Sequence, residues 1–315
     1  MITTIAMAAA LAALLSMGLL AIFNRHLHRS LAAPREPLRG SLADHGLTGR
    51  TIRIPTRRSR HLAGWWLPGH GTRGSVVVAH GWGTNRETML PLARSLQAEG
   101  WHVLLFDMRN HGESDPDDYS SMPRFAEDIE ASVDWIRAQP GIGEAPVALL
   151  GHSVGGAAAL LAASRRDDIA AVVSLSTFAH PADMMRRWLR WKKLPFFPVG
   201  WYVLRYVERV IGHRFDSIAP IHTLPRAQCP VLLVHGRDDP VIPVADAERL
   251  HAHRGETPTT LSLLPGQHDL SEHLETHLPD LHGFLEQAVH LRRRHECEIG
   301  GRAMIENDPA RHDDT

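Results

Sequence analysis

Residues 147–156 read Val-Ala-Leu-Leu-Gly-His-Ser-Val-Gly-Gly, an apolar run that ends in a serine flanked on both sides by glycine. The Ala/Leu-rich residues 157–164 follow and predict a helix. A serine at such a strand-to-helix turn has strained backbone angles, and the glycines keep neighbouring side chains from colliding. The turn lifts the Ser153 hydroxyl above the carboxyl edge of a sheet and points the Val154 N–H toward any oxyanion formed there. A nucleotide-binding turn would look similar, but no G-x-G-x-x-G or Gly-Lys-Ser/Thr loop accompanies it.

Short apolar runs recur along the chain on both sides of this turn. They are residues 76–79, 103–106, 147–150, 171–175, 231–234 and 261–264. Such runs predict strands buried on both faces, which is typical of a parallel sheet. Helical patterns such as 87–99 and 124–138 lie between them, so the sequence predicts a doubly wound, mostly parallel α/β sheet. Residues 51–55 and 62–67 predict an antiparallel pair of strands at its edge.

Composition excludes several classes of protein. Of the 315 residues 43% are hydrophobic and 22% are charged, which excludes disorder over the whole length and a polytopic membrane protein. With 34 Lys and Arg against 35 Asp and Glu, the charge gives no reason to expect nucleic acid as a partner. Cys229 and Cys297 cannot make a disulfide framework or a Cys-x-x-Cys metal pair, and their small number favours a reducing compartment.

The N-terminal residues 1–24 carry no charged side chain, and at about 1.5 Å per residue they are long enough to cross a hydrocarbon layer of about 30 Å. Positive charges follow this stretch, whereas a cleaved signal peptide carries them before it. We therefore expect an uncleaved transmembrane anchor, with the rest of the chain in the cytoplasm. A signal peptide cut near Ala32-Ala33, or a helix that packs on the domain, remains the alternative. Residues 25–50 are expected to be a linker.

The remaining chain divides by composition into a domain, an insertion and a tail. Residues 51–290 carry the sheet pattern, and residues 178–226 interrupt it between two strands. The insertion holds 9 of the 19 aromatic residues and 9 Lys and Arg against 3 Asp and Glu, which predicts a helical cap over the sheet edge. It would face an apolar substrate pocket and an anionic membrane surface, or simply fill a small core of its own. The polar residues 291–315 are predicted to be a disordered tail.

A serine hydroxyl needs a base to act as a nucleophile at neutral pH, and the base needs a third group to orient it. His268 follows the strand that ends near residue 264, which places it at the same sheet edge as Ser153. The strand ending at residue 234 leads into Asp238 and Asp239, and either carboxylate could orient the histidine. Ser, Asp and His follow one another along the chain in one of the three known orders of such catalytic triads.

A second glycine-bearing turn, His80-Gly81-Trp82-Gly83, follows the first parallel strand. It predicts that the Trp82 N–H joins that of Val154 as a second donor to an oxyanion. The histidines at 80, 152 and 235 do not have the spacing of a helical metal pair, so no metal site is expected.

Taken together, these stretches resemble the α/β-hydrolase-fold serine hydrolases. The matching segments are 80–83, 107–114, the serine turn at 151–156, 235–243 and His268. The resemblance covers roughly residues 50 to 290 and is nearest to single-span bacterial members of the esterase, monoacylglycerol-lipase-like and serine-aminopeptidase-like group. It implies that Asp239, the residue before Pro240, is the acid. Asn110 stands where the family often has glycine, and asparagine tolerates the left-handed backbone that the turn needs.

The sequence therefore predicts a membrane-tethered serine hydrolase that cleaves a carboxylic ester with an apolar or lipid-like acyl group. Ser153, Asp239 and His268 would be catalytic, Trp82 and Val154 would hold the oxyanion, and no cofactor or metal would be needed. The expected partners are a small-molecule or lipid ester and the membrane, through residues 1–24 and the basic aromatic cap. A serine peptidase, an acyltransferase, or a catalytically silent binding protein of the same fold are the alternatives.

Overall fold

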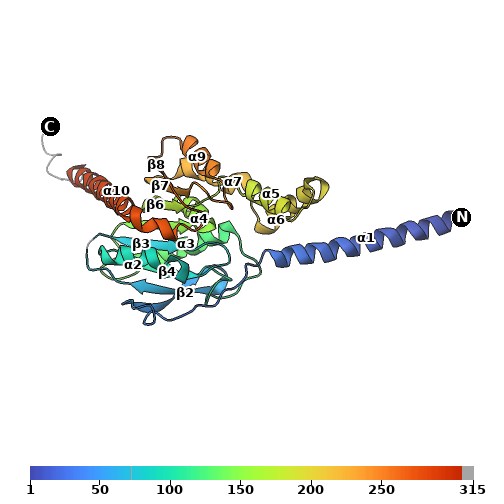
Figure 1. Ribbon diagram of the computed structural model, residues 1–315, viewed down its shortest axis with the longest axis horizontal. Helices are drawn as coiled ribbons and strands as arrows, with labels where there is room; N and C mark the ends of the chain where they lie inside the picture. The colour runs from blue at the N-terminus through green and yellow to red at the C-terminus, as the bar shows by residue number, and fades with distance from the viewer. Residues whose placement is uncertain (72, 307–315) are drawn as a thin grey trace, which may run out of the picture.

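The computed structural model describes residues 1–71 and 73–306, and in them eight strands form one sheet in the order β1-β2-β4-β3-β5-β6-β7-β8 (Figure 1). The strands are β1 (Arg50–Thr56), β2 (Arg60–Leu67), β3 (Ser75–Ala79), β4 (His102–Phe106), β5 (Val147–His152), β6 (Ile169–Leu175), β7 (Val231–Gly236) and β8 (Thr259–Leu264). Strands β1 and β2 are antiparallel to their neighbours, and the other pairs are parallel. The predicted sheet and its antiparallel edge pair are confirmed.

Helices cover both faces of the sheet (Figure 1). The helices in the described part of the chain are α1 (Ile2–Ser30), α2 (Leu90–Ala98), α3 (Met122–Arg137), α4 (Val154–Ala163), α5 (Pro181–Trp191), α6 (Trp201–Ile211), α7 (Phe215–Ile218), α8 (Pro220–Thr223), α9 (Val244–Ala252) and α10 (Ser271–Glu306). Side chains of α3 and α4 share one apolar cluster with one face of the sheet, and side chains of α2 and α10 share the cluster on the other face. Strands β3 to β7 are buried on both faces between these layers, which explains their apolar sequences.

The insertion between β6 and β7 is helical, as expected. It contains α5 and α6, joined through a short π-helical turn, Phe196–Gly200, and then α7 and α8. Met184 and Trp188 pack against the core, whereas Trp191, one turn further along α5, leaves 54% of its surface exposed. Figure 1 shows α5 and α6 projecting from the sheet on the side from which α1 leaves the body. We call residues 178–226 the cap.

Helix α1 spans 29 residues with a mean hydropathy of 2.4 over its most apolar window, and none of that window is buried. It is long and apolar enough to cross a membrane. It continues six residues past the expected end at residue 24, and Leu27 in this extension is buried in the apolar cluster that also contains side chains of α3 and α4. The following residues 31–49 reach β1 largely without regular structure.

The expectation of a disordered tail from residue 291 was wrong for the part that the structure describes. Helix α10 continues to Glu306, and residues 307–315 lie outside the described residues. Its inner turns bury Leu281 and Leu285 against the sheet. Beyond them, Arg292 donates to the Asp167 carbonyl at 2.7 Å, so the polar residues after 291 extend a helix that packing has already formed.

Candidate active site

Ser153 lies at the turn between β5 and α4 with φ 55° and ψ −120°, the strained conformation that the sequence predicted. The turn is close-packed: a Cβ on Gly151 would lie 2.4 Å from the Gly155 carbonyl, and one on Gly155 would lie 2.5 Å from the His80 carbonyl. Only glycine fits at both positions. The Ser153 N–H donates to Leu175 O at 2.8 Å, which ties the turn to the neighbouring strand β6. The strain is therefore held by the surrounding backbone.

Three side chains from distant parts of the sequence meet at this turn. His268 Nε2 lies 3.2 Å from Ser153 Oγ, and His268 Nδ1 lies 2.7 Å from Asp239 Oδ2. The imidazole is 21% exposed, whereas the Asp239 side chain is fully buried. This is the geometry in which a histidine accepts the proton of the hydroxyl while the carboxylate fixes its Nδ1–H tautomer.

The two aspartates that follow β7 lie in different surroundings. Asp238 is exposed, and Asp239 is buried with its carboxylate against His268. Asp239 Oδ1 also accepts the backbone N–H groups of Val241 and Ile242, each at 2.8 Å. Burial alone would raise the pKa of Asp239, but the hydrogen bonds from His268 and these amides lower it below its ordinary value. The carboxylate therefore stays ionised beside the imidazole.

His152, the residue between Gly151 and Ser153, has a role that the sequence analysis did not assign. Its Nε2–H donates to the carbonyl of His268 at 2.9 Å, and the two rings lie 4.9 Å apart. Burial lowers its pKa, which keeps it neutral. His152 thus anchors the backbone of the loop that carries His268. The sequence could not reveal this, because the acceptor is a backbone oxygen 116 residues away.

The loop after β3 lies beside Ser153, since a Cβ on Gly81 would lie 3.5 Å from the Ser153 Cβ. Two buried histidines shape this loop. His80 Nδ1–H donates to the Gly81 carbonyl at 2.7 Å, and His111 Nε2 accepts the Gly83 N–H at 3.1 Å. Burial is the main cause that lowers the pKa of His80 to about 4 and that of His111 to about 3. Both rings are therefore neutral hydrogen-bonding groups at pH 7.

Residues 31–40, which we call the strap, lie against the same loop. A Cβ on Gly83, where φ is +74°, would lie 2.9 Å from Cγ of Pro34. Arg35 donates to the Ser114 carbonyl at 2.5 Å in the loop after β4. The segment expected to be a linker is thus packed on the loop that carries Trp82.

Polar groups at the start of the next helical turn hold the strap. Asn85 Nδ2 lies within hydrogen-bonding distance of two successive strap carbonyls, that of Glu36 at 3.3 Å and that of Pro37 at 3.2 Å. The Glu87 carboxylate accepts the backbone N–H groups of Arg39 at 2.7 Å and Gly40 at 2.9 Å, and contacts His45 Nε2 at 2.8 Å. Burial raises the pKa of Glu87, but these hydrogen bonds outweigh burial and hold the pKa below its ordinary value.

The loop at 107–114, which includes His111, supports the loop that carries Trp82. Asp107 forms a buried ion pair with Arg86, and Arg109 donates to Asp128 at 2.7 Å, so both side chains hold the loop in place. Asn110 adopts φ 68°, the left-handed conformation that asparagine tolerates. Among the residues that the structure describes, no group of three or more metal-ligating side chains comes together.

Comparison with known proteins identifies the family to which this chain belongs. The sequence profile of the Hydrolase_4 family, described as serine aminopeptidase, S33, matches residues 70–214. An uncharacterized protein of Mycobacterium tuberculosis is 30% identical over 221 residues, which cover 69% of this chain and 71% of that protein. The chain belongs to the α/β-hydrolase family of serine hydrolases.

Other relatives of this hydrolase are consistent with that assignment. The serine hydrolase BPHL of Homo sapiens is 29% identical over 224 residues, which cover 64% of this chain and 75% of that protein. Among solved structures, the esterase Pf2001 of Pyrococcus furiosus aligns with a TM-score of 0.68 and 21% identity, over 82% of this chain and 97% of that one. At that identity the likeness shows the fold alone.

Proposed function

We propose that this hydrolase cleaves a carboxylic ester through an acyl-enzyme on Ser153. The proposal rests on one observation, the continuous chain of contacts from Ser153 Oγ through His268 to the buried Asp239 carboxylate. Such a chain activates a hydroxyl that is otherwise a poor nucleophile at neutral pH.

In the first half of the reaction Ser153 Oγ attacks the ester carbonyl while His268 Nε2 takes the hydroxyl proton. The C–O bond to the alcohol then breaks, and the same imidazolium returns the proton to the leaving alkoxide. In the second half a water molecule gives a proton to His268, attacks the acyl carbon and releases the acid, and the proton returns to Ser153. Asp239 stabilises the imidazolium in both halves and stays ionised throughout.

The backbone N–H groups of Val154 and Trp82 are the donors that we propose for the oxyanion. Val154 N–H is at the first residue of α4, where backbone donors and the helix dipole favour negative charge. The Trp82 turn adjoins Ser153 through Gly81. The remainder of that turn is fixed by His80, His111 and the strap, so the donor is held in place before the substrate arrives.

An apolar acyl group is favoured by the side chains around this turn. Trp82 keeps 40% of its surface exposed and stacks on Phe125 with ring centroids 6.4 Å apart and an interplanar angle of 9°. A partly exposed indole on the residue after Gly81, which adjoins Ser153, offers a flat apolar surface to a substrate. We further propose that α1 anchors the enzyme in a membrane with the hydrolase domain in the cytoplasm, since the basic residues Arg25 and Arg29 follow the apolar stretch.

The test uses the detergent-solubilised full chain. A fluorophosphonate probe should label the wild type and fail to label Ser153→Ala, and p-nitrophenyl esters should be cleaved faster as the acyl chain lengthens from acetyl. Aminoacyl p-nitroanilides serve as the comparison for peptidase activity. Labelling that persists in Ser153→Ala would remove the nucleophile from the proposal, and faster cleavage of the anilides would replace the ester by a peptide substrate.

A further inference from the structure

The tip of the cap exposes an apolar surface. Residues 190–198, which begin with the last two residues of α5 and end before α6, are nine consecutive exposed residues. The large apolar side chains exposed here, with the first residue of α6, are Trp191, Leu194, Phe196, Phe197 and Trp201. Phe197 leaves 77% of its surface uncovered. Five large exposed apolar side chains within twelve residues are unusual for a solvent-exposed segment, and we take them as the mark of an interaction site. We call residues 190–201 the cap tip.

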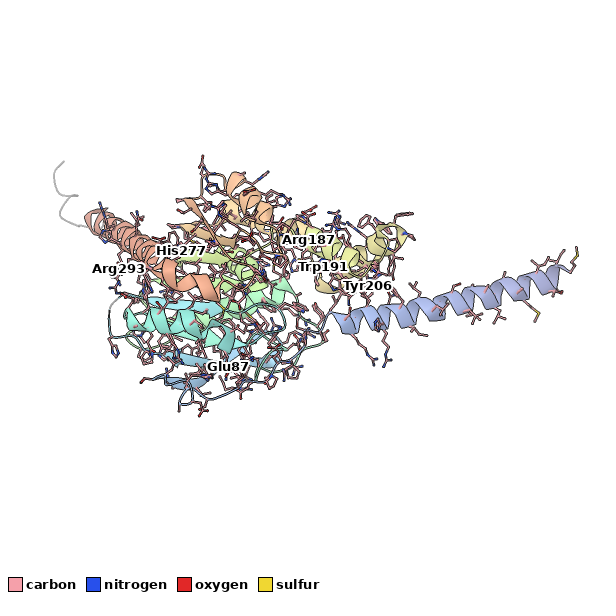
Figure 2. All side chains as sticks on the ribbon, viewed as in Figure 1. Glu87, Arg187, Trp191, Tyr206, His277 and Arg293 are labelled. Atoms are coloured by element: carbon pink, nitrogen blue, oxygen red, sulfur yellow. The ribbon has the colours of Figure 1, made fainter. Side chains whose placement is uncertain are left out.

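The cap tip adjoins the end of the apolar part of α1. Tyr202 Oη donates to the side-chain oxygen of Asn24 at 2.7 Å, and Tyr206 Oη donates to the Asn24 carbonyl at 3.0 Å. The ring of Phe23 lies 6.0 Å from that of Tyr202. Asn24 is the last residue before the first charge of the chain, so these contacts fix α6 at the level where α1 would leave the hydrocarbon. Figure 2 shows Tyr206 on the cap beside α1.

The charge of the cap tip is uniformly positive. It carries Arg190, Lys192 and Lys193 and no acidic residue, and all three are exposed. Deeper in the cap, by contrast, Arg187 pairs with Asp246 at 2.7 Å and Arg186 with Asp183 at 3.0 Å. Within the part of the chain that the structure describes, no carboxylate forms an ion pair with the three cap-tip cations.

We propose that the cap tip inserts into the headgroup region of the same anionic bilayer that α1 crosses, so that the enzyme is held to the membrane at two points. This inference rests on the proposed anchoring by α1 and not on the proposed hydrolysis. Segments that lie in a membrane interface typically combine aromatic side chains with neighbouring lysine and arginine residues. The tyrosines at Asn24 occupy the headgroup level, where one end of the ring is apolar and the other meets water.

The alternative occupant is a second copy of this chain. A protein interface would bury the cap tip against surface of matching charge, and two copies related by a twofold axis would bring the same three cations toward one another. An anionic leaflet instead attracts them, at about 1 kcal/mol for each basic residue near its surface. The bilayer is therefore the occupant that the charge favours, and it would place the cap beside a pool of lipid-like esters.

The experiment places a fluorescent label at the cap tip of the full chain. Phe197→Cys in a Cys297→Ser background is labelled with bimane, and Cys229 stays unlabelled because it is buried and burial raises its thiol pKa to about 12. The matched control is Glu256→Cys, an exposed residue in the turn between α9 and β8. Both proteins are reconstituted into vesicles of phosphatidylcholine and phosphatidylglycerol, with and without bromine on the acyl chains.

We expect brominated lipid to quench the label at 197 and to leave the label at 256 unchanged. The double substitution Lys192→Glu with Lys193→Glu should weaken the quenching in vesicles with phosphatidylglycerol and leave it unchanged in pure phosphatidylcholine. Equal emission at 197 with and without bromine would overturn the proposal. If that label were also shielded from aqueous iodide, a second copy would be the occupant. No turnover is measured, so failure of the proposed hydrolysis would not affect the result.

Discussion

Gly83→Ala tests whether the loop that carries Trp82 positions a donor to the oxyanion, separately from any effect on the stability of the fold. Gly83 has φ +74°, a conformation that costs a residue with a Cβ about 1–2 kcal/mol. The new Cβ would also lie 2.9 Å from Pro34 Cγ in the strap, so the loop or the strap must move. The displaced loop carries the Trp82 N–H. Because removing a donor from an oxyanion hole lowers the rate by about 10²–10³-fold, we expect kcat to fall by at least about tenfold.

Gly141→Ala is the matched control, since Gly141 also has φ +74° but has nothing within 4 Å of the position of a Cβ. Each variant should lose about 1 kcal/mol of stability or more, which corresponds to a fall in Tm of at least about 2 °C. Only Gly83→Ala should lose kcat, measured on a p-nitrophenyl ester with KM little changed. If both variants lower Tm alike and neither changes kcat, the loop does not hold the oxyanion and the reasoning fails.

Three further predictions follow from the same contacts. Asp239→Asn should lower kcat by ~10⁴-fold because the amide favours the wrong tautomer of His268, while Asp238→Asn at the exposed neighbour should leave ester hydrolysis unchanged; equal losses would contradict the assignment. His111 has a folded pKa of about 3, so the unfolded state binds the extra proton below about pH 6.5 and stability falls as pH drops toward 3. His111→Asn should therefore make the unfolding free energy, measured by urea titration, fall less steeply between pH 7 and 5; an unchanged slope would show that the ring is not held neutral. Asn110→Gly should keep the turn at φ 68° but lose its hydrogen bond to Ser120, so Tm should fall by a few degrees with kcat unchanged; a loss of kcat would mean that this turn positions the site.

Most of the architecture could be predicted from periodicity, because the parallel strands β3 to β7 are buried on both faces and their sequences are therefore apolar runs. The same logic located Ser153, His268 and the aspartate region, since the carboxyl ends of parallel strands share one edge of the sheet. The choice of Asp239 needed the family resemblance, and the structure supplies its physical basis in the burial of one neighbour and the exposure of the other.

The end of the chain shows where composition misleads. Residues 291–306 are polar and were expected to be disordered, but they continue α10, whose earlier turns bury Leu281 and Leu285. Composition measures whether a segment can form its own core. It does not measure whether a helix that is already nucleated by packing will extend into the segment.

The strap was missed for a different physical reason, and that reason also bears on function. The Glu87 carboxylate and the Asn85 amide hold the strap through its backbone N–H and C=O groups, which every non-proline residue possesses. The side chains of residues 31–40 therefore show no pattern from which these backbone contacts could have been predicted. Yet Pro34 lies against Gly83, which is two residues from Gly81, and Gly81 adjoins the nucleophile Ser153. The chain that leaves the proposed membrane anchor thus passes directly over the loop proposed to stabilise the transition state, which makes the linker a structural component of the site.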